Sequence, residues 1–193
     1  MKSICVYCGS ANQAPRKYIL AAHRMGETLS RRGLTLVYGG GRTGLMGAVA
    51  DSVLAAGGQV IGVITEGMNT PELAHTRLTR LEVTATIHQR KARMYALADG
   101  YLALPGGYGT FDELFETLTW AQIGEHHKPV GLLNVDGYYN PLLEMLDRAV
   151  TEEFLFPEHR ASLLCATEPE NLLDAMESNV YPDEAVRRWM KQE

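Results

Sequence analysis

The stretch that decides the fold is YLALPGGYGTFDELFETLTWAQ, which occupies residues 101–122. It begins with the apolar run Tyr101–Leu104, passes through a glycine-rich loop over Pro105–Thr110 and continues as a helical pattern over 110–124. A strand that is apolar throughout, rather than at every second residue, is typical of a parallel sheet covered by helices on both faces. The stretch therefore predicts one strand, one tight loop and one helix of an α/β protein.

The same alternation of short apolar runs and longer helical patterns extends along the chain in both directions. Strands are predicted at Ile4–Cys8, Leu34–Tyr38, Val60–Ile64, Leu81–Thr84, Tyr101–Leu104, Val130–Val135 and Leu163–Ala166. Helices are predicted near residues 15–32, 44–56, 87–98, 110–124, 139–150 and 168–177. This order predicts a doubly wound α/β fold with a mainly parallel sheet of six to seven strands and helices on both faces. We expect a single domain over residues 1–180 and a C-terminal helical tail over 181–193, with Val186 and Trp189 three residues apart.

Composition and charge argue against several classes of partner. The 193 residues are 46% hydrophobic and carry 18 Lys and Arg against 23 Asp and Glu, a formal net charge of −5. We expect no nucleic-acid partner, because no run of basic residues would follow a phosphate backbone. We expect no membrane partner, because no apolar stretch approaches the roughly 18 residues that span a bilayer. The first residues show no signal-peptide pattern, which predicts a cytoplasmic protein.

Two glycine-rich loops follow predicted strands, and each opens a helix. The first is Gly39–Gly47 and the second is Pro105–Thr110. Ligands of open α/β sheets bind beyond the carboxyl ends of the strands, and glycine lets backbone N–H groups approach a phosphate at a helix start. The two loops therefore predict a site for an anionic ligand, such as a phosphate ester. The chain has no G-x-x-x-x-G-K-[ST] motif, which argues against P-loop hydrolysis of a triphosphate.

Dinucleotide binding is an alternative interpretation of the first loop. Gly39, Gly41 and Gly44 have the spacing of G-x-G-x-x-G, and Glu66 follows the next strand, where an acid can hold a ribose. However, this motif follows the second strand instead of the first. It also leaves the loop over Pro105–Thr110 without a role.

Charged residues gather after the fourth and fifth predicted strands. Arg90 and Lys91 lie in the first turn of a predicted helix, where cations oppose the helix dipole. Their position indicates contact with an anion, and the alternative is a pair of solvated cations. Glu113 lies near the start of the next helix, and Thr110-x-x-Glu113 has the spacing of a capping box. The residues alone leave Glu113 between a chemical role and a helix cap.

Cys5 and Cys8 form a C-x-x-C within an extended run, where residues three apart face opposite sides of a sheet. A redox pair needs a thiol at a helix start, and a zinc site needs a second ligand pair. The histidines also lack the spacing of metal ligands. The sequence therefore predicts buried strand cysteines, no metal and no cofactor.

The order of several motifs resembles that of one family. Pro105–Glu113 reads PGGYGTFDE and resembles the P-G-G-x-G-T-x-x-E signature of the Lonely Guy (LOG) family. These are cytokinin riboside 5′-monophosphate phosphoribohydrolases that are often labelled lysine decarboxylases. Further similar segments are Cys8–Ser10, Tyr38–Gly41, Gly44–Gly47, His88–Lys91, Trp120–Gln122 and Gly137–Tyr139. The likeness covers residues 3–178, nearly the whole domain.

The resemblance implies a Rossmann-like homodimer that hydrolyses the N-glycosidic bond of a nucleoside 5′-monophosphate such as AMP or isopentenyladenosine monophosphate. The products would be a free base and ribose 5-phosphate. Arg90 and Glu113 match the family's catalytic pair. The residues and the resemblance together give these candidate substrate-binding positions: Ser10, Gly41, Gly44, Glu72, Lys91, Gly106, Gly107, Tyr108, Gly109, Thr110, Asp112 and Thr119. Asp112 replaces a Glu of many plant members, and the segment 66–78 departs further from them, which leaves the base specificity open.

Two other functions compete with hydrolysis. A decarboxylase needs a lysine for a Schiff base with pyridoxal phosphate. Lys128 precedes a predicted strand, at the wrong edge of the sheet, and Lys91 belongs to the nucleotide-contacting pair. A non-catalytic nucleotide or molybdenum-cofactor carrier would use the same loops, and the presence of both Arg90 and Glu113 favours the enzyme.

Two groups of apolar or aromatic residues have open roles. Leu114, Leu118 and Ala121 are candidate contacts of the homodimer, unless they face the sheet. Tyr138 and Tyr139 follow the sixth predicted strand, and they either line the pocket or pack in the core.

Overall fold

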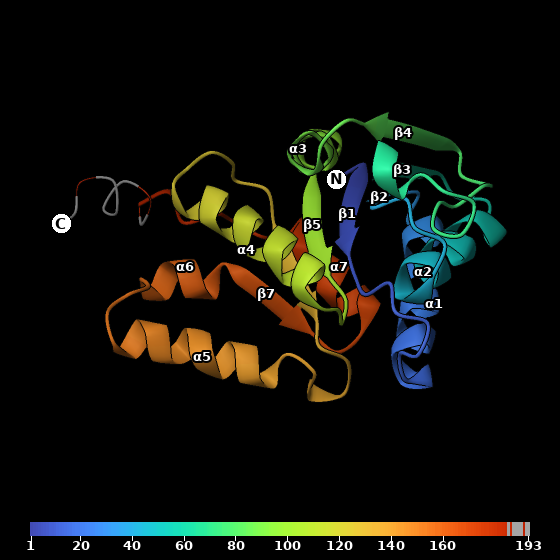
Figure 1. Ribbon diagram of the computed structural model, residues 1–193. Helices are drawn as coiled ribbons and strands as arrows, with labels where there is room; N and C mark the ends of the chain where they lie inside the picture. The colour runs from blue at the N-terminus through green and yellow to red at the C-terminus, as the bar shows by residue number, and fades with distance from the viewer. Residues whose placement is uncertain (185, 187–190, 192–193) are drawn as a thin grey trace.

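The computed structural model describes residues 1–184, 186 and 191, and its centre is a seven-stranded sheet (Figure 1). The strands are β1 (Ser3–Tyr7), β2 (Thr35–Tyr38), β3 (Val60–Thr65), β4 (Arg80–Thr84), β5 (Gly100–Ala103), β6 (Val130–Leu133) and β7 (Leu163–Ala166). All neighbours pair in parallel, in the order β4-β3-β2-β1-β5-β6-β7. The predicted doubly wound α/β sheet is confirmed. Most of the expected tail helix, including Trp189, lies outside the described residues.

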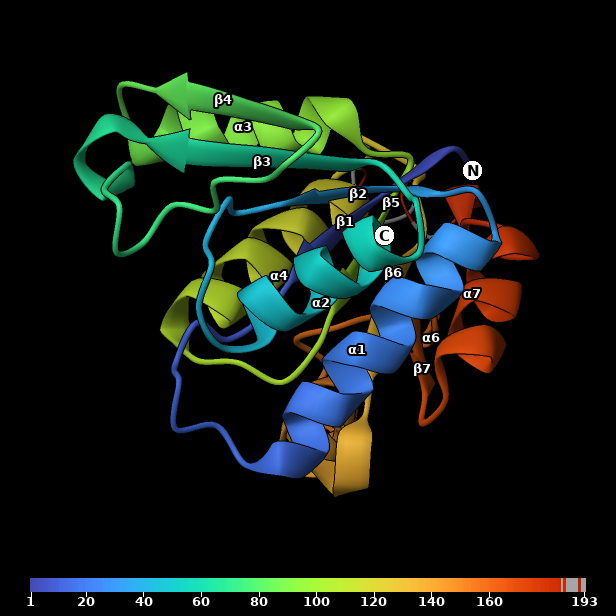
Figure 2. The same ribbon diagram turned by 90° about the vertical axis from the view of Figure 1, so that its right-hand side faces the viewer.

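Helices cover both faces of the sheet. The first face carries α1 (Arg16–Arg31), α2 (Gly44–Ala55) and α7 (Pro169–Glu177), which stand in front of the strands in Figure 2. The opposite face carries α3 (Ile87–Leu97), α4 (Tyr108–Gln122), α5 (Asn140–Thr151) and α6 (Pro157–Ala161). Two 3₁₀ turns, η1 (Glu66–Met68) and η2 (Val135–Gly137), follow β3 and β6. The sequence pattern missed α6, because a helix of about one turn shows no 3.6-residue period.

Among the described residues, no helix combines the length and the apolar character that a membrane span requires.

Two of the three candidate dimer contacts on α4 face the core: Leu114 is fully buried and Ala121 is 2% exposed. Leu118 packs against the same core cluster. Those three residues therefore hold α4 on the sheet, which was the alternative interpretation of their spacing.

The side chains of β1 alternate between the two layers. Cys5 packs among the core residues of the α3–α6 face, and Cys8, directly after the strand, packs among those of the α1–α2–α7 face. Both cysteines are free thiols. Burial raises the pKa of both thiols, so they stay protonated at neutral pH. The expected burial of both cysteines is confirmed, although Cys8 lies one residue beyond the end of β1.

The position of β1 in the sheet creates the crevice that holds the candidate site. From β1 the chain winds outward through β2, β3 and β4, and it then returns to place β5 on the other side of β1. The connections after β1 and β5 therefore leave in opposite directions, and a crevice opens between them at the carboxyl edge. Gly9 N–H donates to the carbonyl of Pro105 at 3.0 Å and joins the two loops at the base of this crevice.

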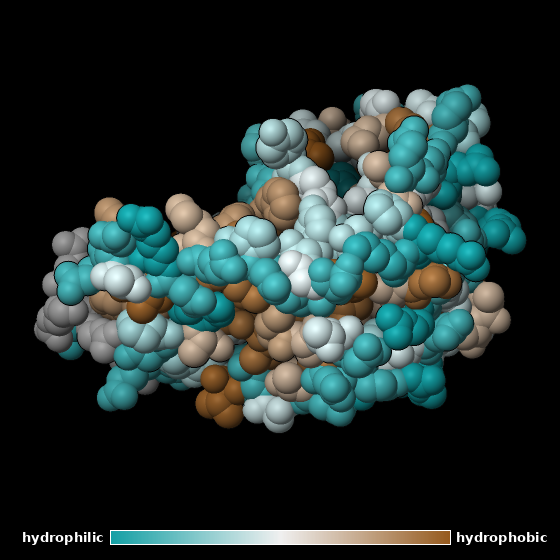
Figure 3. Space-filling model, turned by 90° about the horizontal axis from the view of Figure 1, so that it is seen from below, coloured by the Kyte–Doolittle hydropathy of each residue, from teal (hydrophilic) through white to brown (hydrophobic). Residues whose placement is uncertain are grey.

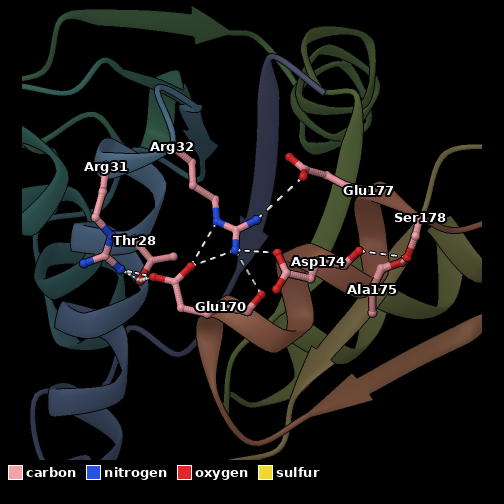
Figure 4. Close-up of polar contacts among 8 residues, drawn as sticks. All are labelled: Thr28, Arg31, Arg32, Glu170, Asp174, Ala175, Glu177 and Ser178. Atoms are coloured by element: carbon pink, nitrogen blue, oxygen red, sulfur yellow. Dashed lines mark hydrogen bonds and ion pairs between the residues drawn. The ribbon is translucent and has the colours of Figure 1, made fainter.

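An ion-pair cluster joins α1 to α7 on the first face of the sheet (Figure 4). Arg32 follows α1, and its guanidinium donates to the carboxylate of Glu170 at 2.7 and 3.0 Å and to that of Asp174 at 2.7 Å. Glu177 lies 3.7 Å from the same guanidinium, and Arg31 also pairs with Glu170. The Arg32 side chain is 20% exposed, so its contacts are better shielded from water than those of a surface pair.

We expect the substitution Arg32→Ala to lower the free energy of unfolding by about 1.5 kcal/mol, because several charged hydrogen bonds are lost together. The matched control is Arg24→Ala, which removes a single 3.2 Å pair with Glu168 from a side chain that is 54% exposed. Its effect should stay below about 0.5 kcal/mol. Urea denaturation at low and high salt measures the free energy of unfolding of both variants, and the loss in Arg32→Ala should shrink as salt rises. Equal losses in the two variants would show that the Arg32 cluster stabilises the fold no more than a surface ion pair.

Candidate active site

A cleft of about 520 Å³ lies at the carboxyl edge of the sheet, where β1 and β5 diverge. Its lining includes Ser10, Arg90, the loop Gly106–Thr110 and Glu113 from the predicted site. Residues from the loop after β1, the starts of α1 and α2, α3, α4 and the turn after β6 complete its walls. The cleft therefore lies beyond the carboxyl ends of the strands, the edge at which the sequence predicts the site.

Arg90 and Glu113 form a buried ion pair in this cleft. One guanidinium N–H of Arg90 donates to Glu113 Oε1 at 2.9 Å, and the two side chains are 6% and 7% exposed. Burial raises the pKa of Glu113 above its usual range, although the charge and hydrogen bond of Arg90 act in the opposite direction. A carboxyl group whose charge is poorly solvated interacts strongly with a positive charge that develops beside it.

Two further contacts hold the Arg90 guanidinium in place. Its Nε donates to the carbonyl of Val63, within β3, at 2.9 Å. Its NH2 lies against Gly39, where the Cβ of any other residue would approach to 2.1 Å. Glycine at position 39 therefore leaves room for the guanidinium, which is a packing role and not a phosphate contact.

The second glycine loop ends in the open start of α4. The helix begins at Tyr108 with Gly107 as N-cap, two residues earlier than the sequence suggested. Thr110 is therefore inside the first turn, and the predicted capping box between Thr110 and Glu113 is wrong. The N–H groups of Gly107–Thr110 have no carbonyl of their own helix to donate to, and the helix dipole adds positive potential there. This helix start faces the cleft and suits an anion.

The first glycine loop is occupied by contacts within the chain. The N–H groups of Leu45 and Met46, in the first turn of α2, donate to the carbonyl of Gly9 at 2.9 and 3.3 Å. Gly44 N–H donates to Asn12 Oδ1 at 3.2 Å, and a Cβ at position 44 would lie 2.6 Å from the backbone of Ser10. Gly41 forms a bridge to Ala74. Neither Gly41 nor Gly44 lines the cleft, so these glycines support the site, and the loop reaches the cleft only through Leu45 and Met46.

Four other candidate residues also lie outside the lining of the cleft. Lys91 bridges α3 to α4 through Asp112 at 3.0 Å and Glu116 at 2.9 Å. Burial opposes the charge of Lys91, but these hydrogen bonds outweigh the effect of burial and raise the pKa of Lys91.

Glu72 and Thr119 are the other two candidate residues outside the lining of the cleft. Glu72 is exposed on the segment between η1 and β4, and hydrogen bonding, first of all with Thr70, lowers its pKa. Thr119 is exposed on α4 and lines a second, smaller pocket beside Phe115 and Leu146.

The cleft also has apolar walls that the sequence analysis did not single out. They consist of Met46, Met68, Ile87 and Tyr18, together with Tyr138, for which a lining role was one of two options. Their only signal in the sequence is that they flank the loops at strand ends. No group of three His, Cys, Asp or Glu side chains within the described residues could hold a metal ion.

The fold and the cleft together define a class of protein. A parallel α/β sheet with an open helix start and a buried carboxylate–guanidinium pair at its switch point defines a Rossmann-like protein with a crevice that suits an anion. The family model described as "Possible lysine decarboxylase" matches residues 46–176. A rice protein (Oryza sativa subsp. japonica) named "Probable cytokinin riboside 5'-monophosphate phosphoribohydrolase LOGL3" is 48% identical, over 93% of this chain and 85% of its own length. The cytokinin riboside 5′-monophosphate phosphoribohydrolase LOG7 of Arabidopsis thaliana is 47% identical, over 91% and 81%. The chain belongs to this family, the LOG family.

Solved structures with the same fold include carriers of a cofactor. The molybdenum cofactor binding protein of Rippkaea orientalis is 25% identical, with a TM-score of 0.70 over 92% of this chain and 97% of that one. The molybdenum cofactor carrier protein of Chlamydomonas reinhardtii is 20% identical, with a TM-score of 0.66 over 91% and 95%, and shows the shared fold.

The decarboxylase description of the family model does not fit this cleft. Within the described residues, no lysine lines it, so none is placed to form a Schiff base with pyridoxal phosphate there. The amine of Lys128 instead donates to Tyr101 Oη and to the carbonyl of Tyr95, both at 3.1 Å.

Proposed function

We propose that this protein hydrolyses the N-glycosidic bond of a nucleoside 5′-monophosphate and releases a free base and ribose 5-phosphate. The observation that carries this proposal is the buried Arg90–Glu113 pair, which lies in the same cleft as the open start of α4. The open helix start suits a phosphate, and the Glu113 carboxylate of the pair suits a cationic transition state. The names of the relatives in rice and Arabidopsis point to the same reaction.

The phosphate is assigned to the second glycine loop. The N–H groups of Gly107–Thr110 supply donors, and Ser10, which also lines the cleft, supplies a hydroxyl. Binding the phosphate at this remote point orients the sugar, so that binding energy is used at the reacting carbon. The first glycine loop, Gly39–Gly47, serves this assignment only indirectly, by supporting the loop after β1 and by clearing space for Arg90.

The chemistry is assigned to Glu113 and Arg90. The bond between C1′ and the base nitrogen breaks with its electron pair going to the base, and C1′ passes through an oxocarbenium-like state. The Glu113 carboxylate stabilises this positive charge or orients the water, whose hydroxyl joins C1′ while its proton ends on the base. Arg90 keeps Glu113 in place and offers positive charge to the departing base; being always protonated, it does not act as the acid.

The function is tested by incubating the purified protein with AMP and with isopentenyladenosine monophosphate, followed by chromatography of the bases. Release of adenine or isopentenyladenine with an equal amount of ribose 5-phosphate is the expected result. Binding of monophosphates without turnover would instead support a carrier of the kind found among the solved structures. The ratio of kcat/KM for the two substrates shows which base is preferred.

The raised pKa of Glu113 predicts the pH dependence of the reaction. Activity requires the ionised carboxylate, so kcat/KM should fall as pH drops through this pKa. The acid limb should therefore lie at a higher pH than that of an ordinary glutamate, whose pKa is about 4.3. The profile is corrected for the substrate phosphate, which titrates near pH 6, and melting curves exclude unfolding. An acid limb at or below the ordinary value would contradict the assigned ionic state.

We also propose that the active form is a homodimer. Tyr108, Phe115, Met145 and Phe154 are 94%, 40%, 65% and 85% exposed, and apolar side chains that gather in one exposed patch mark interaction surfaces. Hydrophobic side chains gather on the part of the surface in Figure 3 that lies over α4, α5 and α6 in Figure 1. Thr119 lies outside the cleft of its own chain, so only a second copy could bring it to a nucleotide. Sedimentation should give twice the 21.3 kDa chain mass, and a fully active monomer would contradict the proposal.

A further inference from the structure

Three successive carbonyls of the loop that precedes α4 each accept a hydrogen bond. Leu104 accepts from Tyr139 Oη at 2.7 Å, and Pro105 accepts from Gly9 N–H at 3.0 Å. Gly106 accepts from Tyr138 Oη. Two of the three donors are neighbouring tyrosine hydroxyls from the turn after β6, a segment that the reaction described above does not use.

The turn after β6 is itself well anchored, so it can act as a support. Asn134 Oδ1 accepts from Tyr139 N–H at 2.8 Å, and Asn134 Nδ2 donates to Asn140 Oδ1 at 2.8 Å. Tyr139 is 1% exposed and packs edge-on against Tyr138, with ring centroids 5.0 Å apart. On its other side Tyr138 packs edge-on against Tyr18 of α1, at 5.6 Å. The Tyr138 ring therefore has a defined orientation in the cleft wall.

The hydrogen bond of Tyr138 acts on the peptide group that supplies the first N–H of the helix start. The carbonyl of Gly106 and the N–H of Gly107 belong to the same planar peptide and point in opposite directions. Fixing this carbonyl on Tyr138 therefore fixes the direction of the Gly107 N–H. A hydrogen bond to the carbonyl also polarises the peptide and strengthens its N–H as a donor.

We propose that Tyr138 is a positioning residue that holds the Gly106–Gly107 peptide in the orientation that binds the 5′-phosphate. This inference rests on the proposed function, because it assigns the phosphate to the start of α4. It separates the two tyrosines: Tyr139 is a core residue that supports the strand end, whereas Tyr138 tunes affinity for the phosphate. Its effect is therefore specific for ligands that carry a phosphate.

The test compares the variant Tyr138→Phe with wild type in two measurements. Calorimetry with AMP and with adenosine is carried out in a Glu113→Gln background, where hydrolysis is slow, and there Tyr138→Phe should weaken AMP binding about 5- to 10-fold, the effect of one hydrogen bond. Its affinity for adenosine should be unchanged. In the hydrolysis assay KM for AMP should rise by the same factor, while kcat changes less than about 2-fold.

The matched control is Tyr95→Phe, which removes a hydroxyl that donates to the carbonyl of Glu125 at 3.3 Å, outside the cleft lining. It should leave both affinities at their wild-type values. Equal weakening of AMP and adenosine in Tyr138→Phe, or no weakening of either, would overturn the proposal. If wild type binds AMP without hydrolysing it, the proposed reaction fails, and the calorimetric comparison still decides the role of Tyr138.

Discussion

Replacing Glu113 with glutamine should lower kcat for nucleotide hydrolysis by about 100-fold or more, in the range of a positioned acid–base or electrostatic group. The carboxylate is 7% exposed and lies in the cleft with the open start of α4. The amide of glutamine has nearly the same shape and still offers an oxygen to Arg90. The substitution therefore removes the negative charge while it keeps most of the packing.

The measurements are kcat and KM, with a melting curve for each variant. KM should change little, because the carboxylate is assigned to the transition state rather than to the bound phosphate. A suitable control is Glu27→Gln, the same change on an exposed position of α1 outside the cleft lining. An unchanged kcat in Glu113→Gln would remove Glu113 from the mechanism and leave it as the buried partner of Arg90.

Replacing Gly39 with alanine should lower kcat/KM by 10- to 100-fold, because a displacement of about 1 Å in a catalytic constellation can cost 100-fold. The added Cβ would lie 2.1 Å from Arg90 NH2 and 3.3 Å from its Cζ. The guanidinium cannot retreat freely, since it is held by the Val63 carbonyl and by Glu113. We therefore expect the Arg90 guanidinium to lose its hydrogen bond to either the Val63 carbonyl or Glu113.

Gly67→Ala provides the control for this prediction. A Cβ at position 67 meets no atom within 4 Å, so activity should stay close to wild type. Combining Gly39→Ala with Glu113→Gln should cost little more than Glu113→Gln alone, because both act through the same pair. Additive losses in the double variant would show that Gly39 acts through something other than the Arg90–Glu113 geometry.

The sheet and its carboxyl edge were predictable because they rest on local patterns. The apolar runs define buried strands, and the alternation with helical periods defines the doubly wound order. The loop at Pro105–Thr110 was likewise recognisable as a helix start that suits an anion, since glycine content and position along the chain are enough to indicate it. Arg90 and Glu113 were singled out from the resemblance to the LOG family more than from their spacing.

The contacts between distant segments were not predictable in the same way. The first glycine loop has the composition of a phosphate loop, but the carbonyl of Gly9, more than 30 residues away, occupies its N–H groups. The capping box at Thr110 failed because Gly107 let the helix begin earlier. Thr119 lies on α4 with Glu113, yet it lines another pocket, because a separation of six positions places two side chains on different faces of a helix.

The amino-acid sequence by itself determined the kind of fold, the edge at which the candidate site lies and the presence there of a glycine-rich helix start that suits an anion. These depend on periodicity and on the conformational range of glycine, which are properties of short segments. Only the tertiary structure decided that Gly39 makes room for a guanidinium and that Tyr138 holds the Gly106 carbonyl. The physical reason is that each of these contacts joins residues from different strand–helix units. Their meeting is set by how the units pack around β1, and no local pattern carries that information.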